Sequence, residues 1–312
     1  MMKTGRRSNE LGVLRPYDFE KPSVKLGYAL LIALLILVLL ISLMPFVWVV
    51  LAGFKDQREF IRGVRTVMAD GSVRYLPRLL PEVFDLSLYV KTWNDTRFYL
   101  YYVNSLIVVA GSAASALVFN GLLAYGLSQL RPRGHRLVLG LVMASLMLPA
   151  TTSMAPLFVN INRIGLSGSF WPLILGVGAS AFYVVLLKNF FDNMPASLLE
   201  SARLDGCSDL SLFFRIVFPL SMPINMVVLI YAINGAWSDF LLPYLVLNNA
   251  KWASGATKET VMVRLFSFQS SNAARDIDVI RAIVFSIIPP ILLFILFQRR
   301  ITDNVVSAGI KG

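Results

Sequence analysis

Six long stretches of this sequence contain no Asp, Glu, Lys or Arg, and they constrain the fold more than any other feature. The stretches are Leu26–Phe54, Phe98–Leu130, Leu137–Asn162, Ile164–Leu187, Ile216–Ser238 and Ala282–Gln298. A helix needs about 20 apolar residues to cross the hydrocarbon core of a bilayer, and each stretch is near or above this length. The sequence therefore predicts an all-α polytopic membrane protein with six transmembrane helices.

Composition and charge agree with a membrane location. The 312 residues are 56% hydrophobic and 15% charged, whereas an average soluble domain is about 45–50% apolar and about 25% charged. The net charge of +11 would suit nucleic acid or an anionic membrane surface. The long uncharged stretches favour membrane lipid, and not nucleic acid, as the partner. A single cysteine, Cys207, and a single histidine, His135, exclude an internal disulfide and a His-based metal site.

The expected organisation is one transmembrane domain, residues 26–300, between two cytoplasmic tails, residues 1–25 and 301–312. Its six spans are predicted at about residues 26–54, 99–129, 137–160, 165–187, 217–247 and 279–298. The spans are joined by loops, of which the long ones are the outer loops 55–98 and 248–278 and a polar cytoplasmic loop at 188–216.

Basic residues close to the spans predict the orientation. The tail before the first span holds six Lys and Arg residues, the loop 129–136 holds three arginines, and Arg299 and Arg300 follow the last span. Because Lys and Arg near span ends favour the cytoplasmic side, both termini are predicted to be cytoplasmic, N-in and C-in.

The outer loops are expected to contain turns and short elements. Asp70-Gly71, Pro77 and Pro81 are turn signals, so the loop 55–98 is predicted to form a small folded cap rather than another span. Arg281 stands one residue before the last uncharged stretch, where its long side chain is expected to extend to the outer membrane interface.

The polar loop between the fourth and fifth spans has a regular pattern. Pro195 suits a first helical turn, Ser197 and Glu200 have the spacing of a capping box, and Gly206 is placed to stop the helix. A second, amphipathic segment covers Ser208–Phe218. Two short helices with a glycine corner are therefore predicted on the cytoplasmic side.

The first of these helices has a surface suited to another protein. Small side chains would allow close approach and charged ones would orient the contact; these are Glu200, Ser201, Ala202, Arg203, Asp205 and Gly206. The alternative is a helix that lies on lipid headgroups, and the spacing alone does not separate the two interpretations.

The fifth span contains polar residues, which are costly inside a bilayer and mark candidate functional sites. Asn234, Trp237, Ser238 and Asp239 lie toward its outer end. Amide and carboxylate groups beside an aromatic face suit a hydroxyl-rich solute, so these residues are candidates for a solute path. The alternative is that Asn234 and Asp239 bond to neighbouring helices while Trp237 is an interface anchor.

The polar loop resembles a known family. Its pattern is similar to the EAA loop in the permease subunits of bacterial ATP-binding-cassette importers. In this sequence the pattern is Glu200-Ser201-Ala202, three residues, Gly206, nine residues, Ile216, one residue, Phe218-Pro219. The family's pattern is Glu-Ala-Ala, three, Gly, nine, Ile, one, Leu-Pro, and the spacing matches throughout.

Other segments resemble the shorter, maltose-type sugar permeases of that family. They are Gly53-Phe54-Lys55, Asn104-Ser105, Leu148-Pro149, Pro156-Leu157-Phe158, Gly165-Leu166, Arg203-Leu204-Asp205-Gly206, Trp237-Ser238-Asp239-Phe240-Leu241-Leu242-Pro243 and Gly309-Ile310-Lys311-Gly312. The resemblance implies a multi-pass subunit of a sugar importer in the bacterial cytoplasmic membrane.

The resemblance also implies partners. They are a second, homologous permease subunit, two ATP-binding subunits below the membrane, and an extracytoplasmic solute-binding protein. This chain would bind no cofactor and would not be an enzyme, because ATP and Mg would be held by the ATPase subunits. The residues that would dock onto an ATPase subunit are Glu200, Ser201, Ala202, Arg203, Asp205, Gly206, Ile216 and Pro219.

Two other classes of function fit the sequence less well. A carrier driven by an ion gradient would need intramembrane charges, and only Asp239 and Arg281 lie near spans. Gly165-Leu166-Ser167-Gly168 resembles an intramembrane serine protease motif, but His135 is expected at the opposite membrane face, out of reach of Ser167. No phosphate-binding loop is present, which agrees with ATP hydrolysis by a partner.

Overall fold

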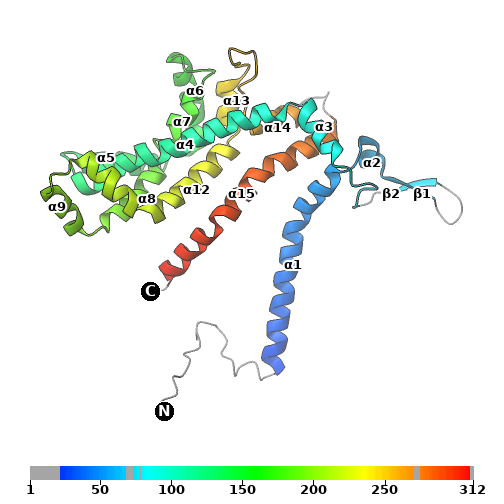
Figure 1. The fold of residues 1–312 in the computed structure, drawn as a ribbon, viewed down its shortest axis with the longest axis horizontal. Coiled ribbons are helices and arrows are strands. Elements are labelled where there is room, and N and C mark those ends of the chain that lie inside the picture. The colour runs from blue at the N-terminus through cyan, green and yellow to red at the C-terminus, as the bar shows by residue number, and fades with distance from the viewer. Residues whose placement is uncertain (1–21, 68–72, 77–78, 270–274, 310–312) are drawn as a thin grey trace. The chain divides into compact units, whose positions relative to one another are not determined.

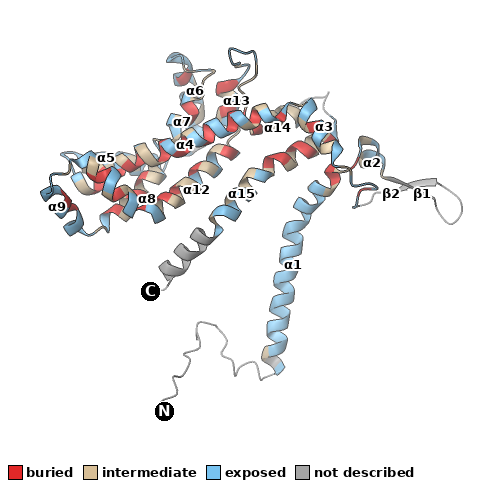
Figure 2. Ribbon diagram, viewed as in Figure 1, coloured by how far each residue is buried: buried red, intermediate tan, exposed pale blue. Residues whose placement is uncertain are grey.

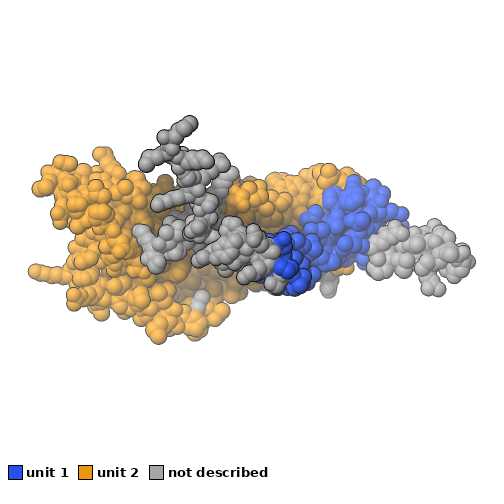
Figure 3. Space-filling view, turned by 90° about the horizontal axis from the view of Figure 1, so that it is seen from below, with its two compact units in different colours: residues 1–84 blue, residues 85–312 orange. Residues whose placement is uncertain are grey.

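The fold is known from a computed structural model that describes residues 22–67, 73–76, 79–269 and 275–309 (Figure 1). The chain divides into two compact units, residues 1–84 and 85–312, which Figure 3 shows in different colours. The tail predicted at 1–25 lies mostly outside the described residues.

The first unit begins with a long apolar helix, α1 (Pro22–Gly53), whose side chains are exposed along nearly its whole length (Figure 2). The 32 residues of α1 are more than the roughly 20 that cross a bilayer core. Its exposed Leu, Ile and Val side chains therefore suit a lipid or protein environment rather than water.

Short elements follow α1, in agreement with the predicted cap. Helix α2 (Gln57–Arg62) is capped by Asp56, whose Oδ1 accepts a hydrogen bond of 2.6 Å from the backbone N–H of Glu59. Strands β1 (Val64–Val67) and β2 (Val73–Leu76) then form an antiparallel hairpin. This hairpin is the one departure from helical structure among the named elements of the described residues.

The second unit is helical. Its elements are α3 (Ser87–Asp95), α4 (Phe98–Tyr125), the π-helical turn η2 (Gly126–Leu130), α5 (His135–Ser145), α6 (Ala150–Arg163), α7 (Trp171–Val177), α8 (Ala181–Asp192), α9 (Ala196–Leu204), α10 (Asp209–Leu212), the π-helical turn η3 (Phe213–Val217), α11 (Phe218–Leu220), α12 (Met222–Ser238), α13 (Leu241–Leu247), α14 (Val261–Gln269) and α15 (Asp276–Gly309).

Within the described residues, four segments are long and apolar enough to cross a membrane: Val24–Gly53, Phe98–Leu130, Trp171–Asp192 and Asp276–Gln298. A fifth candidate is a bent pair, in which Asp209–Leu220 and Met222–Ser238 meet at 85°. The helical, polytopic class is therefore confirmed, while the number of six spans and the N-in/C-in orientation stay predictions.

The third predicted span differs from the structure. Helices α5 and α6 replace a continuous helix over 137–160, and a turn at Leu146–Leu148 and Pro149 separates them. Pro149 lacks a backbone N–H and disfavours helical geometry in the residue before it, so the helix stops there. Neither helix alone reaches the length of a span.

The core of the second unit is built around α4, which packs on α7, α8 and α12. Two glycines permit this close packing. Gly111 of α4 faces Ile174 of α7 with no room for a Cβ, and Gly178, which follows α7, faces Ser115 and Phe119 of α4 in the same way. The interhelical contact thus depends on missing side chains, as is common between membrane helices.

Candidate functional site

Helix α9 is the first half of the loop that resembles the EAA loop. It begins after Pro195, which occupies the N-cap position and makes no side-chain cap. The capping-box interpretation of Ser197 and Glu200 is therefore wrong, because a capping box requires the serine at the N-cap. Proline can start the helix without it, since the first N–H groups have no intrahelical partner.

Gly206 ends α9 as the sequence predicts. It has φ +81°, a left-handed conformation that costs little only for glycine. Its N–H donates to the carbonyl of Arg203 (3.0 Å), and the N–H of Cys207 donates to the carbonyl of Ala202 (3.1 Å). This is the Schellman pattern of hydrogen bonds, which closes the helix sharply.

The second half of the loop starts at Ser208, whose hydroxyl accepts a hydrogen bond from the N–H of Ser211 and caps α10. An exposed ion pair, Arg203 to Asp209 at 3.7 Å, spans the glycine corner. Helix α10 continues through η3 and α11 to the 85° bend. The two predicted helices with a glycine corner are therefore present.

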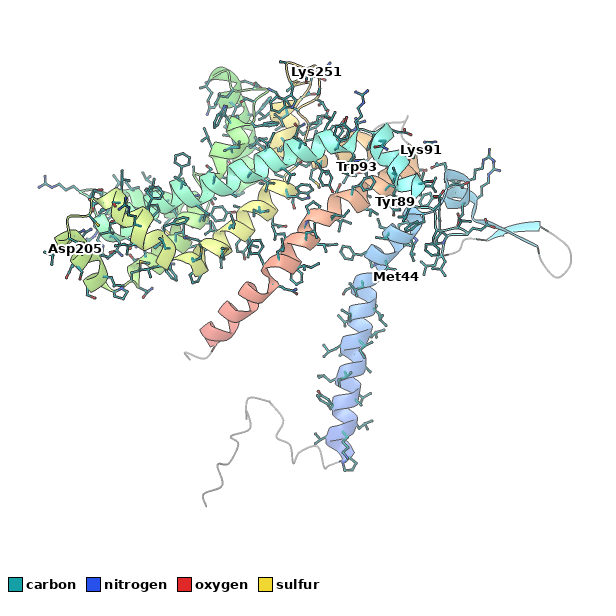
Figure 4. All side chains as sticks on the ribbon, viewed as in Figure 1. Met44, Tyr89, Lys91, Trp93, Asp205 and Lys251 are labelled. Carbon is teal, nitrogen blue, oxygen red and sulfur yellow. The ribbon has the colours of Figure 1, made fainter. Side chains whose placement is uncertain are left out.

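The two faces of α9 have opposite surroundings. Leu199 and Ala202 are buried in the apolar core formed with Leu212, Phe213 and Val217. The other side chains of the predicted docking surface are exposed, namely Glu200, Ser201, Arg203 and Asp205, together with Leu204, which is 89% exposed. Figure 4 shows Asp205 at the tip of the bundle.

Three predicted docking residues do not share this exposed face. Ala202 lies on the inner side of α9, so it anchors the helix to its own chain. Ile216 is half-buried against the same core, and Pro219 is exposed in α11. A largely apolar hollow of about 300 Å³ opens beside them, lined by Phe190, Asn193, Met194, Pro195, Leu198, Leu199 and Leu220.

The four candidates for the solute path also divide into two pairs. Trp237 is only 4% exposed; its Nε1 donates to the carbonyl of Ser286 (3.1 Å), and its ring packs edge-on against Tyr102. Asp239 is half-buried beyond the end of α12, where it accepts hydrogen bonds from the backbone N–H groups that begin α13. The polar groups of both side chains are therefore hydrogen-bonded within the chain.

Asn234 and Ser238, in contrast, are exposed and one helical turn apart on α12. Tyr231 and Gly235 are exposed on the same face, since residues three and four apart lie together on a helix. This strip combines an amide, a hydroxyl and an aromatic ring, the groups that suit a hydroxyl-rich solute.

Arg281 does not extend to the membrane interface as expected. Only 5% exposed, it donates from Nη1 to Asp278 Oδ1 (3.1 Å) and to Thr92 Oγ1 (3.1 Å). Thr92 Oγ1 in turn donates to Asp278 (2.9 Å). Burial raises the pKa of nearby Tyr89 to about 12, so that phenol stays neutral and the counter-charge comes from Asp278.

Asn104 is a second buried polar group whose role the sequence did not reveal. Its Nδ2 donates to the carbonyls of Thr257 and Glu259 (2.9 Å each), and its Oδ1 accepts from Trp252 Nε1 (3.0 Å). These bonds fix the loop after α13 onto the start of α4. The sequence shows Asn104 in an apolar stretch but does not show these bonds, because the partners lie about 150 residues away in the sequence.

Nothing in the described part of the chain groups three or more His, Cys, Asp or Glu residues as a metal ion would require. The second unit therefore combines a loop helix that has one anchored and one exposed face with a polar strip on α12.

Comparison with known proteins gives the particular family. Residues 100–307 match the binding-protein-dependent transport system inner membrane component, and the chain belongs to this family. The family resemblance carried by the loop residues is thereby confirmed.

The relatives agree along most of the chain. It is 30% identical to the polygalacturonan/rhamnogalacturonan transport system permease protein YtcP of Bacillus subtilis (strain 168), over 91% of this chain and 97% of that protein. It is 30% identical to the diacetylchitobiose uptake system permease protein NgcG of Streptomyces coelicolor, over 88% and 85%. It is 27% identical to the arabinooligosaccharides transport system permease protein AraQ of Bacillus subtilis, over 88% and 92%.

The family determines the role. The chain is a multi-pass inner membrane protein and the permease of an ATP-binding-cassette importer, not an ion-coupled carrier. It is not an enzyme: ATP is hydrolysed by partner ATPases, and a solute-binding protein is a further partner.

Proposed function

We propose that this chain is one of two related permease subunits in an importer for a sugar or oligosaccharide. The relatives named above support the solute class, since their names give polygalacturonan/rhamnogalacturonan, diacetylchitobiose and arabinooligosaccharides as their solutes. In this assembly the two subunits form the path together, two ATPase subunits hold ATP and Mg, and the binding protein delivers the solute from outside.

The proposed topology has six spans with both termini in the cytoplasm. Arg131, which follows η2, supports this orientation, because it lies within 4.0 Å of Asp192 at the end of α8, shortly before α9. Basic residues and α9 therefore occur at the same ends of the spans, and basic span ends favour the cytoplasmic side.

Helix α9 is the proposed docking element for an ATPase subunit. The observation that carries this assignment is its division into a buried face, Leu199 and Ala202, and an exposed face, Glu200, Ser201 and Arg203. A helix fixed to its own core can transmit a push from a partner instead of moving independently. The apolar hollow beside α9 offers the partner additional surface to bury.

The test is a Gly206→Trp substitution with Gly255→Trp as the matched control. Both glycines have φ +81° and open space where a side chain would begin, so the backbone strain is the same. Gly206→Trp is expected to abolish co-purification of the ATPase subunit from native membranes, whereas Gly255→Trp retains it. Equal recovery of ATPase from both variants would contradict docking at α9.

The exposed strip of α12 is the proposed contribution of this chain to the solute path. Asn234 and Ser238 supply hydrogen bonds to solute hydroxyls, while Trp237 and Asp239 hold the surrounding helices. The double variant Asn234→Ala with Ser238→Ala is expected to raise the solute concentration for half-maximal uptake. Unchanged uptake kinetics in proteoliposomes would remove the strip from the path, without affecting the docking proposal.

A further inference from the structure

The 85° bend between α11 and α12 joins the docking loop to the helix that carries the proposed solute strip. Along the chain, a displacement of α9 reaches α12 through this bend or is absorbed in it. How rigid the bend is therefore decides whether the loop can move α12.

The bend is an interruption of the helical hydrogen bonds. Pro219 and Pro223 lie on either side of it, and neither has a backbone N–H to donate. The turn before it, η3, is already π-helical: the N–H of Phe218 reaches back to the carbonyl of Phe213. Breaks of this kind occur often at functional positions of helices.

Two buried side chains add hydrogen bonds at the bend. Asn225 is 4% exposed, and its Nδ2 donates to the carbonyl of Phe218 (2.9 Å), seven residues earlier and across the bend. Ser221 is fully buried, and its hydroxyl donates to the carbonyl of Val217 (2.6 Å). Bonds of this length and burial are strong because water does not compete for the groups.

Apolar side chains also pack around the bend. Val217 and Val228 flank the bend in the sequence, both fully buried in the core that includes Phe213. Phe213 packs against Tyr125 of α4, with Gly121 leaving room for its ring. The corner is thus braced against α4, and the Asn225 amide is its cross-link.

We propose that Asn225 is a positioning residue for coupling: its hydrogen bond to Phe218 keeps the corner rigid, so that a displacement of α9 to α11 rotates α12. The inference rests on the proposed docking of α9 and the proposed path along α12. Asn225 lies nine residues before Asn234, about 13 Å along the helix at 1.5 Å per residue, too far to contact a solute there.

The experiment measures solute taken up per ATP hydrolysed by the complete complex in proteoliposomes, with the binding protein present. Asn225→Leu keeps the approximate size of the side chain and removes the donor. Uptake per ATP is expected to fall by roughly threefold to thirtyfold, the range seen for side chains that carry coupling between distant sites. The complex still assembles and hydrolyses ATP, because α9 is untouched.

Asn120→Leu is the matched control. Asn120 is also fully buried, and it bonds to Ala116 and Val177 within the same core but far from the bend in sequence. Its loss is expected to reduce the amount of complex and leave uptake per ATP unchanged. An Asn225→Gln variant keeps an amide donor and is expected to restore part of the ratio.

The outcomes distinguish the positioning role of Asn225 from the proposed docking of α9. An unchanged ratio in Asn225→Leu, or an equal fall in Asn120→Leu, would refute the positioning role and leave the importer assignment intact. Should Asn225→Leu fail to assemble, Ser221→Ala decides in the same way, with a smaller expected fall. Absence of any ATPase in the unsubstituted preparation would refute the proposed docking itself.

Discussion

The two ends of α4 are held by different kinds of interaction. Near Tyr125 the core is apolar apart from uncharged polar side chains such as Asn120 and Asn225, and the charged groups of the docking loop lie on its surface. Near Phe98 the packing is aromatic and also polar, since Arg281 and Asn104 are buried with their hydrogen-bond partners.

The difference follows from what each end must do in the proposed importer. A docking loop that meets a partner keeps its polar groups outside, where they remain hydrated until contact. At the other end polar groups bond within the chain, and an unmade bond there is expensive. Near Tyr125, surface charges are therefore available to contact a partner. Near Phe98, buried charges stabilise the chain's own structure.

Arg281→Met is expected to have the largest effect on stability. It leaves Asp278 and Thr92 without their buried partner, and breaking a buried pair costs about 3–5 kcal/mol. The lower part of this range is expected because Arg275 still contacts Asp278. Thermal unfolding of the purified chain in detergent measures the loss.

The control for this experiment is the double variant Arg281→Met with Asp278→Leu. It removes both charges, so most of the stability is expected to return. If the Arg281→Met variant is as stable as the original chain, the stability of the end near Phe98 does not depend on the buried pair.

Leu199→Ala tests the apolar end. Leu199 is 3% exposed, and truncation of a buried leucine costs about 2–5 kcal/mol. We expect about 3 kcal/mol, because exposed neighbours on α9 allow partial collapse of the cavity.

Leu204→Ala is the matched control on the same helix, at 89% exposure. It is expected to leave the stability of the isolated chain unchanged and to weaken binding of the ATPase subunit. Equal stability losses in the two leucine variants would show that α9 is not divided into an anchored and a free face.

The features that sequence reasoning found are local ones. The stop at Gly206 depends on one residue and its immediate neighbours, so a single glycine after an amphipathic turn was enough to predict it. The uncharged stretches also predicted the four long apolar segments of the described residues. They did not predict the break at Pro149 or the 85° bend at the start of α12. Family resemblance then located the loop that connects α8 to α12.

The features it missed depend on distant partners. Arg281 bonds to Thr92 and Asn104 to Thr257, and no periodicity of a single segment encodes such pairs. Trp237 stood in a suitable place for a solute path, but its ring is buried by α4 and α15. Assigning a polar residue in a span to function or to packing required knowing which way it faces.

Asn104→Leu is expected to have a smaller and more local effect, about 2 kcal/mol, within the cost of leaving buried hydrogen-bonding groups unpaired. It frees the carbonyls of Thr257 and Glu259 and the indole N–H of Trp252. Hydrogen exchange is expected to accelerate in residues 250–260 and not in α9. Exposed Asn94→Leu is the control, and equal acceleration there would contradict the anchoring role.

The smallest effect on stability is expected for Arg203→Ala, which removes the exposed ion pair with Asp209. Exposed pairs contribute about 0–1 kcal/mol and are screened by salt. The same substitution is nevertheless expected to weaken ATPase binding, because Arg203 lies on the exposed face of α9. Measuring unfolding and ATPase recovery at low and high salt separates these two effects. A stability loss above about 2 kcal/mol, well beyond the range for an exposed pair, would mean that this end also depends on charged cross-links, and the contrast between the two ends of α4 would no longer hold.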